Sequence, residues 1–584
     1  MRVRIREKLT AVGAAIAALS LSAGSCGMVV PTPLPSNATV SCPGGDAPTG
    51  HGEGTLRVLA GSELKDLAEI KDAQDSTIID HISSETGIRV AMSYVGTLDG
   101  LQQVISGKAG ENYDAVWFPS NRYLDLYLKA HPGLAPIGTP TSIMRSPVVL
   151  GVRPDAINRL GWYTPPSWRT IASRATERQF SFAMTNPAAS NSGFSALIAM
   201  ATALAGTTGP LNPAQLNQVR PDLAGLFSAQ QLTAGSSGWL KDAYVKRAHD
   251  GTAIDAMINY ESVLLSVNRQ AISDSDKLTL IYPTDGVITA DYPLTPLVSG
   301  NAQAQHNERV VRDYLCQAKV QAELMTMTHR RPVRGDVSLA GEFGLQRLHE
   351  LNPPDQLTVA DALIKEFSNT IRRPARTIYV LDLSGSMNTK DARDPTKLDA
   401  SDPPKIRRID ALRSALLGLT GVDTSLAAQS AVFHEREQVI LLTFSDTPSD
   451  PQRFEIPAGS PDQKLAEIAR AVDGMKAGGN AAIYDALAQA YAIAGEPTQV
   501  ARYTTIVLFS DGDRTSGRDL AGFRQYYDSL PLAQRQIPVF AVMVGEGNVA
   551  ELTSLSKQLT NGEFFDGNRQ GSLAKVFQEI RAYQ

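Results

Sequence analysis

The sequence predicts an α/β protein built from two unequal domains, and three observations support this. The chain has 584 residues, which is too many for a single hydrophobic core. Short apolar runs of strand length alternate with runs of helical periodicity, which is typical of parallel strands joined by crossover helices. The composition changes near Pro353 and Pro354, which interrupt any helix. We therefore expect domains at 55–345 and 375–584, with a linker at 346–374.

The first domain begins abruptly with a short buried strand at 55–61, and Ser62 suits the N-cap of the helix that follows. Further strands are expected where apolar residues cluster between turn signals, and helices where they recur every three or four positions. The expected strands are 88–96, 113–120 and 146–152, and the expected helix is 98–107.

A stretch at 182–206, FAMTNPAASNSGFSALIAMATALAG, leads from a strand through a Ser/Asn-rich loop into a helix. Asn191 or Ser192 is positioned to cap that helix. The free N–H groups and the positive dipole end of a helix N-terminus suit an anion. Plain capping explains the same residues, so the fragment alone leaves both interpretations open.

The second domain continues the alternation of strands and helices. The expected strands are 377–382, 438–445, 504–511 and 537–545, and the expected helices are 405–419, 464–475 and 482–495. The first of these strands runs into the segment DLSGSM, which is too polar to belong to a core.

Asp382, Ser384 and Ser386 follow at the carboxyl end of this strand, where ligand sites of parallel α/β sheets gather. Alternate side chains of an extended loop share one side, so the carboxylate and the two hydroxyls can converge. A hard, all-oxygen set of this kind suits Mg²⁺ better than Zn²⁺. Asp511 ends another strand and can bring a second carboxylate to the same edge. Such a set leaves coordination positions for water or for an acidic partner.

Three motifs, VLDLSGSM, GGNAAIYDAL and FSDG, occur in the order found in the von Willebrand factor A domain, which residues 375–584 resemble. The resemblance implies a doubly wound, Rossmann-like fold with a metal-ion-dependent adhesion site. The metal positions that it implies are Asp382, Ser384, Ser386 and Asp511. Ala481 stands where the family usually has Thr. Three alternatives follow: the metal site is weakened, Asn480 substitutes, or the domain has kept its fold and lost metal-dependent adhesion. With Mg²⁺ bound, the resemblance implies a protein partner whose acidic side chain completes the coordination.

The first domain resembles the periplasmic-type solute-binding proteins of ABC importers, particularly the molybdate/sulfate-like class. The resemblance rests on LRVLAGSELKDL, VGTLDGL, TNPAASNSGFSAL, AIDAMINYESVLL and LTLIYPTDG, and it spans about 55–345. It implies two α/β lobes that are joined by crossover strands and close on a ligand. The cleft residues that it implies are Ser62, Thr97, Ser120, Asn191, Ser192 and Tyr260. These hydroxyls and amides suit a small polar or anionic solute, although the fold could also serve as a spacer or a protein-binding surface.

The N-terminus indicates export. Four basic residues within the first eight positions precede the apolar run TAVGAAIAALSLSAG, which has the length of a signal peptide. Cys26 follows small residues and resembles the lipid-modified cysteine of a bacterial lipoprotein, which makes 1–26 the signal. We expect a lipid anchor on the extracytoplasmic side of the cell membrane; ordinary cleavage with secretion, and an uncleaved anchor through Val30, are the alternatives.

Residues 27–54 are rich in Pro, Gly, Ser and Thr without an apolar period, which is typical of a flexible stalk. Besides Cys26, the chain contains only Cys42 and Cys316. They can pair in an oxidising compartment, or remain two separate thiols.

The composition and motifs exclude several function classes. A net charge of −5 gives no general attraction to nucleic acid or to an anionic membrane. The sequence contains no H-E-x-x-H, no G-x-S-x-G and no Walker motif. SELK fits S-x-x-K, but its companion motifs are missing. We therefore expect a protein that is not an enzyme.

The sequence as a whole predicts an exported, lipid-anchored surface protein. It would recognise a protein partner through the metal site and bind a small solute in its N-terminal cleft. One alternative is the solute receptor of an ABC importer with an appended docking domain. A chaperone-like assembly factor for a metal enzyme is another, but export argues against it.

Overall fold

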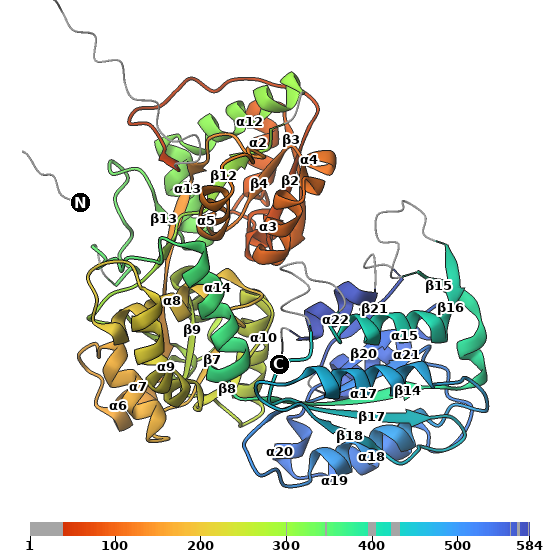
Figure 1. Cartoon of the computed structure of the whole chain (residues 1–584). Helices are drawn as coiled ribbons and strands as arrows, with labels where there is room; N and C mark the ends of the chain where they lie inside the picture. Colours follow the sequence, from red (N-terminus) through yellow and green to blue (C-terminus); the bar gives the residue numbers. More distant parts are fainter. Residues whose placement is uncertain are drawn as a thin grey trace, which may run out of the picture.

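The computed structural model describes residues 39–298, 301–344, 347–394, 404–421, 432–560, 562–568, 573–581 and 583. The predicted signal at 1–26, with Cys26, lies outside this range. None of the described helices is long and apolar enough to cross a membrane. Figure 1 shows two lobes formed by the N-terminal half of the chain and a further domain formed by the C-terminal half.

The first lobe contains a six-stranded sheet in the order β1–β5–β12–β4–β2–β3. Its strands are β1 (Val40–Ser41), β2 (Thr55–Gly61), β3 (Arg89–Val95), β4 (Ala115–Trp117), β5 (Thr141–Ser142) and β12 (Pro293–Pro296). Its helices are α1 (Asp66–Glu69), α2 (Ile78–Thr86), α3 (Thr97–Ile105), α4 (Lys108–Asn112), α5 (Arg122–Ala130), α12 (Ala302–Leu315) and α13 (Ala318–Thr328). The apolar run of β2 is fully buried and contacts α3 and α12, which explains why it reads as a continuous hydrophobic strand.

The second lobe contains a sheet in the order β10–β6–β9–β7–β8, and β11 and β13 also pair with β6. Its strands are β6 (Met144–Val152), β7 (Phe182–Met184), β8 (Gln230–Leu232), β9 (Ala256–Tyr260), β10 (Thr279–Ile281), β11 (Thr289–Ala290) and β13 (Arg331–Pro332). Its helices are α6 (Pro154–Leu160), α7 (Trp168–Thr176), α8 (Asn191–Ala205), α9 (Pro213–Phe227), α10 (Ser237–His249) and α11 (Glu261–Gln270).

The chain crosses between the two lobes more than once. It leaves the first lobe through β5 and enters the second through β6, and it returns where β11 pairs with β6 and β12 pairs with β4. After α13, β13 pairs with the first residues of β6. The crossover strands implied by the resemblance are therefore present.

Two expected helix caps differ in the structure. Ser62 is the first residue of a short 3₁₀ helix (Ser62–Lys65), whose N-cap is Gly61. The N-cap of α8 is Ser190, so Asn191 and Ser192 lie inside the first turn, and Ser190 makes no side-chain capping bond. Both Asn191 and Ser192 bond to other side chains instead, and this tertiary bonding could not be read from the local pattern.

The expected stalk at 27–54 differs as well, because the part that the structure describes is attached to the first lobe. β1 pairs in parallel with β5, and Cys42 forms a disulfide with Cys316. Asp46 pairs with Arg334 at 2.7 Å. A disulfide and polar contacts hold this segment with little apolar packing, which is why its composition resembles that of a free linker.

The expected linker at 346–374 contains a helix that packs on both lobes, α14 (Leu357–Glu366). Tyr123 of the first lobe donates a hydrogen bond to Asp361, at 2.6 Å between oxygens. The ring of Phe367 lies 5.1 Å from that of Phe227 in the second lobe. The segment is therefore a packed part of the N-terminal half.

The C-terminal domain contains a sheet in the order β18–β17–β14–β19–β20–β21, in which only the β17–β18 pair is antiparallel. Its strands are β14 (Ala375–Asp382), β17 (Gln438–Phe444), β18 (Gln452–Glu455), β19 (Tyr503–Ser510), β20 (Val539–Met543) and β21 (Phe564–Asp566). Its helices are α15 (Arg408–Gly418), α17 (Asp462–Asp473), α18 (Ile483–Ala494), α19 (Leu520–Ser529), α20 (Leu532–Arg535), α21 (Val549–Thr553) and α22 (Leu573–Arg581).

Helices cover both faces of this sheet. Tyr379 and Leu381 of β14 enter a core shared with α15, α17 and α22, whereas Ile378 and Val380 enter a core shared with α18, α19 and α21. Alternate residues of one strand therefore serve two cores, as a doubly wound fold requires.

The helix expected at 405–419 begins later than predicted. Residues Lys405–Arg407 form β16, which pairs antiparallel with β15 (Lys390–Arg393), and the helix begins at Arg408. Pairing with a strand earlier in the chain overrides the local helical pattern at these residues.

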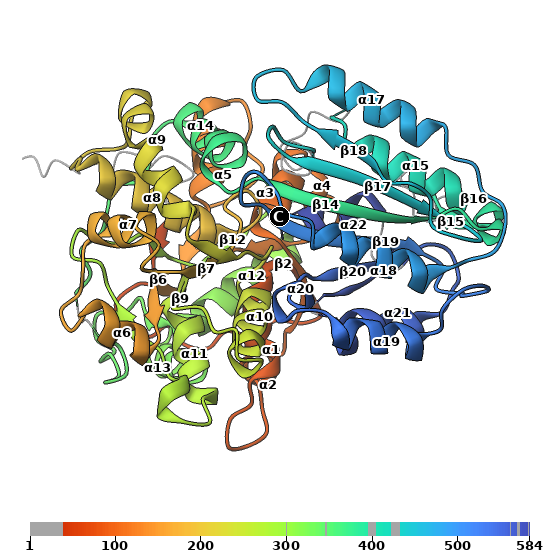
Figure 2. The same cartoon turned by 90° about the horizontal axis from the view of Figure 1, so that it is seen from below.

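The second lobe contacts the C-terminal domain through α10 and β8. Figures 1 and 2 both place α10 beside the C-terminal domain. The indole of Trp239 stacks on Tyr583 with 5.1 Å between ring centroids. Tyr503 donates a hydrogen bond to the carbonyl of Gln230 at 2.6 Å.

Candidate functional site

Asn191 and Tyr260, two of the cleft residues that the resemblance implies, contact each other in the protein interior. The Asn191 amide donates a hydrogen bond to the hydroxyl of Tyr260 at 2.9 Å. The ring of Tyr260 is buried and lies 6.0 Å from that of Tyr292, which belongs to the crossover between the lobes. Burial raises the pKa of Tyr260 well above its usual value, so its hydroxyl stays protonated.

Ser192 is also buried, but its hydroxyl is already occupied within the second lobe. Its oxygen lies 2.8 Å from the hydroxyl oxygens of both Thr185 and Ser237, and 3.1 Å from that of Ser190. This network fixes the loop before α8 and leaves Ser192 little capacity for a solute.

Thr97 and Ser62 lie on the first lobe, at the starts of α3 and of the short 3₁₀ helix. A Cβ on Gly96, next to Thr97, would come within 3.4 Å of the carbonyl of Ala189 in the second lobe. The two lobes therefore touch beside Thr97, which is buried.

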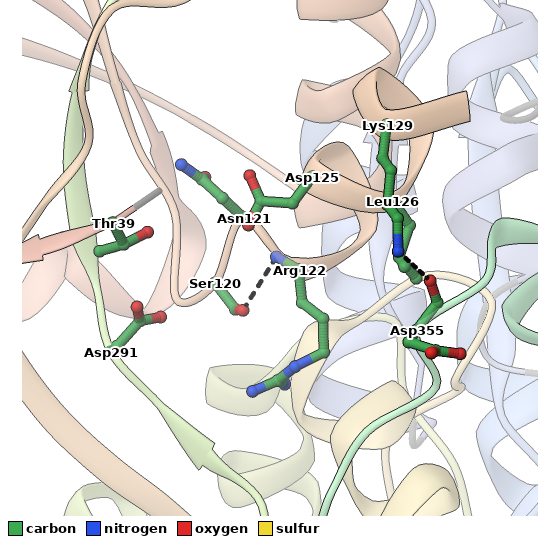
Figure 3. A pocket seen from close by; sticks show the side chains of 9 residues that line it. All are labelled: Thr39, Ser120, Asn121, Arg122, Asp125, Leu126, Lys129, Asp291 and Asp355. Carbon is green, nitrogen blue, oxygen red and sulfur yellow. Dashed lines mark hydrogen bonds between the residues drawn. The ribbon is translucent and has the colours of Figure 1, made fainter. Parts of the chain in front are cut away.

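Ser120 belongs to a different hollow, a cavity of about 250 Å³ that Figure 3 shows from close by. Its hydroxyl accepts a hydrogen bond from the backbone of Arg122 at 3.1 Å. Burial and the nearby Asp291 raise the pKa of Asp125 to about 7. The other five implied cleft residues do not line this cavity, so the structure does not bring all six together.

Arg330 is the main residue of the inter-lobe region that the sequence argument missed. Its side chain is 1% exposed and lies 2.5 Å from a carboxylate oxygen of Asp66. It also donates to the carbonyl of Glu63 at 3.1 Å, and its guanidinium lies 4.9 Å from the ring centroid of Tyr292. The sequence argument expected only hydroxyl and amide ligands in the cleft. The one sequence feature that could have indicated a buried arginine is the adjacent pair Arg330 and Arg331 just after α13.

Burial shapes the charges around Arg330. It raises the pKa of Glu63 to about 7, although Arg330 opposes this shift. The Nε atom of Arg330 and one carboxylate oxygen of Asp66 are buried without a hydrogen-bond partner among the described residues. Buried polar atoms are normally satisfied, so these two atoms indicate a place where a further polar group belongs.

The predicted metal positions at the edge of the C-terminal sheet converge in part. Asp382 is fully buried at the end of β14 and accepts hydrogen bonds from the backbone of Ser384 at 2.8 Å and from the hydroxyl of Ser510 at 2.6 Å. The hydroxyl oxygens of Ser384 and Ser386 lie 3.0 Å apart. Burial raises the pKa of Asp382 to about 6, and Asp511 adds to the shift.

Asp511 already forms an ion pair with a cationic side chain of the same domain, Arg408. The guanidinium of Arg408 lies 2.6 Å from one of its carboxylate oxygens and 2.5 Å from a carboxylate oxygen of Asp391. Arg408 is buried at the first position of α15, and Asp511 is fully buried. One of the predicted metal positions is therefore neutralised by an arginine that the sequence argument did not assign.

The position that is usually Thr in the family is Ala481 in this chain, and in the structure it offers no metal ligand from its side chain. Ala481 has no side-chain oxygen, and its backbone N–H donates to the hydroxyl of Thr515 at 2.7 Å. The amide of Asn480 instead donates to Asp446 at 2.6 Å.

The oxygen atoms of Asp382, Ser384 and Ser386 nevertheless fit a hard divalent cation. Among the described residues, Asp382 has no cationic partner within ion-pair distance, and an uncompensated buried carboxylate is costly. These three residues would hold Mg²⁺, with Asp511 and its arginine beside them.

Another candidate metal-binding group lies on the first lobe. Ligand atoms of Asp72, His81 and Glu323 all lie within 4.8 Å of one another. One imidazole nitrogen of His81 lies 3.1 Å from Asp72 and the other contacts Glu323. Because the two nitrogens face different carboxylates, hydrogen bonding explains this cluster without an ion.

Comparisons with known proteins agree with this architecture. Residues 68–321 match the family model described as bacterial extracellular solute-binding protein, and residues 377–514 match that of the von Willebrand factor type A domain. A comparison with curated proteins finds no match.

Several solved structures are similar to part of this chain. A ferric binding protein from Campylobacter jejuni has 13% identity and a TM-score of 0.40, covering 53% of this chain and 98% of its own. A sulfate-binding protein from Mycobacterium tuberculosis has 16% identity and a TM-score of 0.37, covering 51% and 93%. A periplasmic binding protein from Actinobacillus pleuropneumoniae, with fructose-6-phosphate bound, has 11% identity and a TM-score of 0.40, covering 56% and 99%.

Both resemblances stated from the sequence are confirmed by the family models. The chain joins a bacterial extracellular solute-binding domain to a von Willebrand factor type A domain.

Proposed function

We propose that this is an exported recognition protein, tethered by a lipid at Cys26, which binds a small polar or anionic solute between its N-terminal lobes. Its von Willebrand factor A domain recognises a protein partner at the edge formed by Asp382, Ser384 and Ser386. The protein is not an enzyme in this proposal.

The observation that carries the solute site is the buried Arg330, whose Nε atom has no described hydrogen-bond partner. Asn191 and Tyr260 supply an amide and a hydroxyl from the second lobe, and Glu63 lies close enough to Tyr260 to raise its pKa. A cation, neutral donors and a carboxyl with a pKa of about 7 suit a small solute that carries hydroxyl or acidic groups.

Calorimetric titration of the full chain tests this site against molybdate, sulfate, phosphate, a monosaccharide and a short peptide. We expect one of them to bind, and Arg330→Gln to weaken it at least tenfold, because a charged hydrogen-bond donor is lost. Tyr260→Phe, which removes only a hydroxyl, should weaken it less. Arg89→Gln changes an exposed arginine of the same lobe and serves as the control. Unchanged binding in both Arg330→Gln and Tyr260→Phe would refute the site.

Mg²⁺ at the C-terminal edge would supply a Lewis-acidic centre for a carboxylate of the partner, as in the family. Asp382, Ser384 and Ser386 would hold it, and Asp511 would contribute less because Arg408 shares its charge. Ligand binding at a hundred times the dissociation constant adds about 2.7 kcal/mol to the native state. We expect millimolar Mg²⁺ to raise the unfolding midpoint of the C-terminal domain in the full chain.

The matched variants are Asp382→Ala, which should abolish the Mg²⁺ response, and Asp450→Ala, an exposed acid of the same domain, which should keep it. The comparison is made within each variant, with and without Mg²⁺, so a general loss of stability does not obscure it. A partner retained on the immobilised chain should then be released by a chelator. A response that survives in Asp382→Ala would exclude this edge as the metal site.

A second candidate, an ABC importer's solute receptor with an appended docking domain, is favoured by the family match over 68–321. Reconstitution separates the two, because a receptor delivers its solute to a permease and stimulates the associated ATPase, whereas a recognition protein does neither.

A further inference from the structure

A second and larger hollow lies between the solute-binding domain and the von Willebrand factor A domain. Its volume is about 560 Å³, within the usual range of small-molecule sites. One wall comes from β8 and α10 of the second lobe. The opposite wall comes from the starts of β19 and β20 and from Lys557, Gly562 and Glu563. In the view of Figure 2 α10 lies next to α20, and residues of α10, α20 and β20 line the hollow.

We call this hollow between the two domains the seam cavity. Most of the charged side chains that line it are cationic. Lys246, Arg247, Arg373, Arg502 and Lys557 line it, against the two acids Asp242 and Glu563. Both acids already have basic neighbours: Asp242 lies 3.7 Å from Lys241, and Glu563 lies 3.2 Å from Lys557.

Arg502 also has a carboxylate partner, Glu455, at 2.8 Å. Lys246, Arg247 and Arg373 form no ion pair with any described residue. The cavity therefore brings together three cations without a counter-ion among the described residues.

The contacts of these three cations hold them in place without neutralising them. Arg247 donates to the carbonyl of Gln231 at 3.2 Å, and Arg373 donates to that of Gln230 at 3.2 Å. The Nε atoms of both arginines are buried and lack a hydrogen-bond partner among the described residues. Burial lowers the pKa of Arg247, which reflects a guanidinium that has lost water without gaining an acid.

Aromatic rings complete the cavity. Trp239, Tyr503, Phe540 and Tyr583 all line it, and Trp239 stacks on Tyr583. Rings of this kind offer flat apolar surface to a ligand. The lining therefore combines a cluster of uncompensated cations with an aromatic wall.

We propose that the seam cavity binds a small aromatic phosphate, whose phosphate group meets Lys246, Arg247 and Arg373 and whose ring lies along the aromatic wall. Guanidinium groups match the oxygens of a phosphate in pairs, which favours this anion. Because Arg247 belongs to the second lobe, and Tyr503 and Phe540 of the aromatic wall belong to the C-terminal domain, the bound ligand links the two domains.

The test uses the full chain and 1-naphthyl phosphate, with 1-naphthol, inorganic phosphate and 1-naphthoate as matched probes. Calorimetry and the fluorescence of Trp239 report binding, and Trp239→Phe identifies the part of the signal that arises in the seam. We expect 1-naphthyl phosphate to saturate one site, and naphthol and inorganic phosphate to bind at least tenfold more weakly. Tighter binding of 1-naphthoate would overturn the phosphate assignment.

The variants Arg247→Gln and Lys246→Gln should each weaken 1-naphthyl phosphate about tenfold. Arg524→Gln, an exposed arginine of the C-terminal domain, and Arg330→Gln, in the inter-lobe region, should leave it unchanged. Within the part of the chain that the structure describes, Lys246 makes a single long hydrogen bond, at 3.5 Å, so Lys246→Gln keeps the test informative if Arg247→Gln does not fold. Absence of saturable binding, or equal affinity in Lys246→Gln and the parent chain, would overturn the proposal.

Discussion

At the scale of single residues, buried charges are held by partners that lie far away in the sequence. Glu437 directly precedes β17 and is almost fully buried. It pairs with Arg372 and with Arg581, the latter at 2.7 Å. Burial alone would raise the pKa of Glu437, but Arg581 and Arg372 more than offset this and His434 adds to their effect, so the pKa is lowered.

Glu437→Gln should destabilise the C-terminal domain by about 3–5 kcal/mol, because two buried guanidinium groups lose their counter-ion. Urea unfolding followed by circular dichroism measures the change. Glu435→Gln alters the neighbouring, more exposed acid and should shift stability far less. A loss below about 1 kcal/mol would contradict the role assigned to Glu437.

The same pair predicts a pH dependence. Because the pKa of Glu437 is lower in the folded state than in the unfolded state, its contribution to stability is complete above the unfolded pKa. That contribution should be lost as the pH falls from the unfolded pKa through the lower folded pKa. The parent chain should therefore lose more stability on acidification than Glu437→Gln does, and parallel curves would contradict the assignment.

At the scale of elements, a disulfide connects the beginning and the end of the first lobe. Cys42 and Cys316 are 274 positions apart in the sequence, and their bond keeps β1 beside β5. The composition of the segment around Cys42 indicates a linker, and only the partner that it meets in three dimensions makes it part of the lobe.

Cys42→Ser should lower the stability of the N-terminal half by about 2–5 kcal/mol, because the closed loop restricts the unfolded chain. Proteolysis should also cut the segment around Asp46 sooner, which mass spectrometry detects. Dithiothreitol should produce the same two effects in the parent chain and none in the variant. If dithiothreitol lowers stability and speeds proteolysis equally in the parent chain and in Cys42→Ser, the disulfide does not stabilise this lobe.

At the scale of the whole molecule, the two family domains are in direct contact. Trp239 on α10 packs on Tyr583 and Phe565 of the C-terminal domain, with centroid distances of 5.1 and 6.2 Å. Tyr503 of the C-terminal domain donates a hydrogen bond to the carbonyl of Gln230, which also accepts one from Arg373. This contact encloses the seam cavity.

Trp239→Ala should loosen the contact while both domains stay folded, because it removes the largest aromatic group at the seam. Small-angle X-ray scattering should report a larger radius of gyration, with circular dichroism unchanged. Trp162→Phe, inside the second lobe, controls for the loss of a tryptophan. An unchanged radius would show that other contacts hold the domains together.

Much of the fold could be predicted because its signals are local. The alternation of strands and helices, and the order of the three C-terminal motifs, depend on periodicity and on short runs of residues. Asp382, Ser384 and Ser386 are close in sequence, so a single strand end brings them together. Local sequence signals were therefore enough to predict the α/β class, the two domain families and the polar end of β14.

The partners of the buried charged groups could not be predicted, because they come from distant parts of the chain. Arg330 reaches Asp66 across 264 positions, and Arg408 reaches Asp511 across 103. The first pairing brings an arginine to the inter-lobe region, and the second neutralises one predicted metal position. The seam cavity forms where the two domains pack together, so neither half of the chain would form it alone. Each of these features depends on long-range packing, for which a single sequence carries no periodic signal.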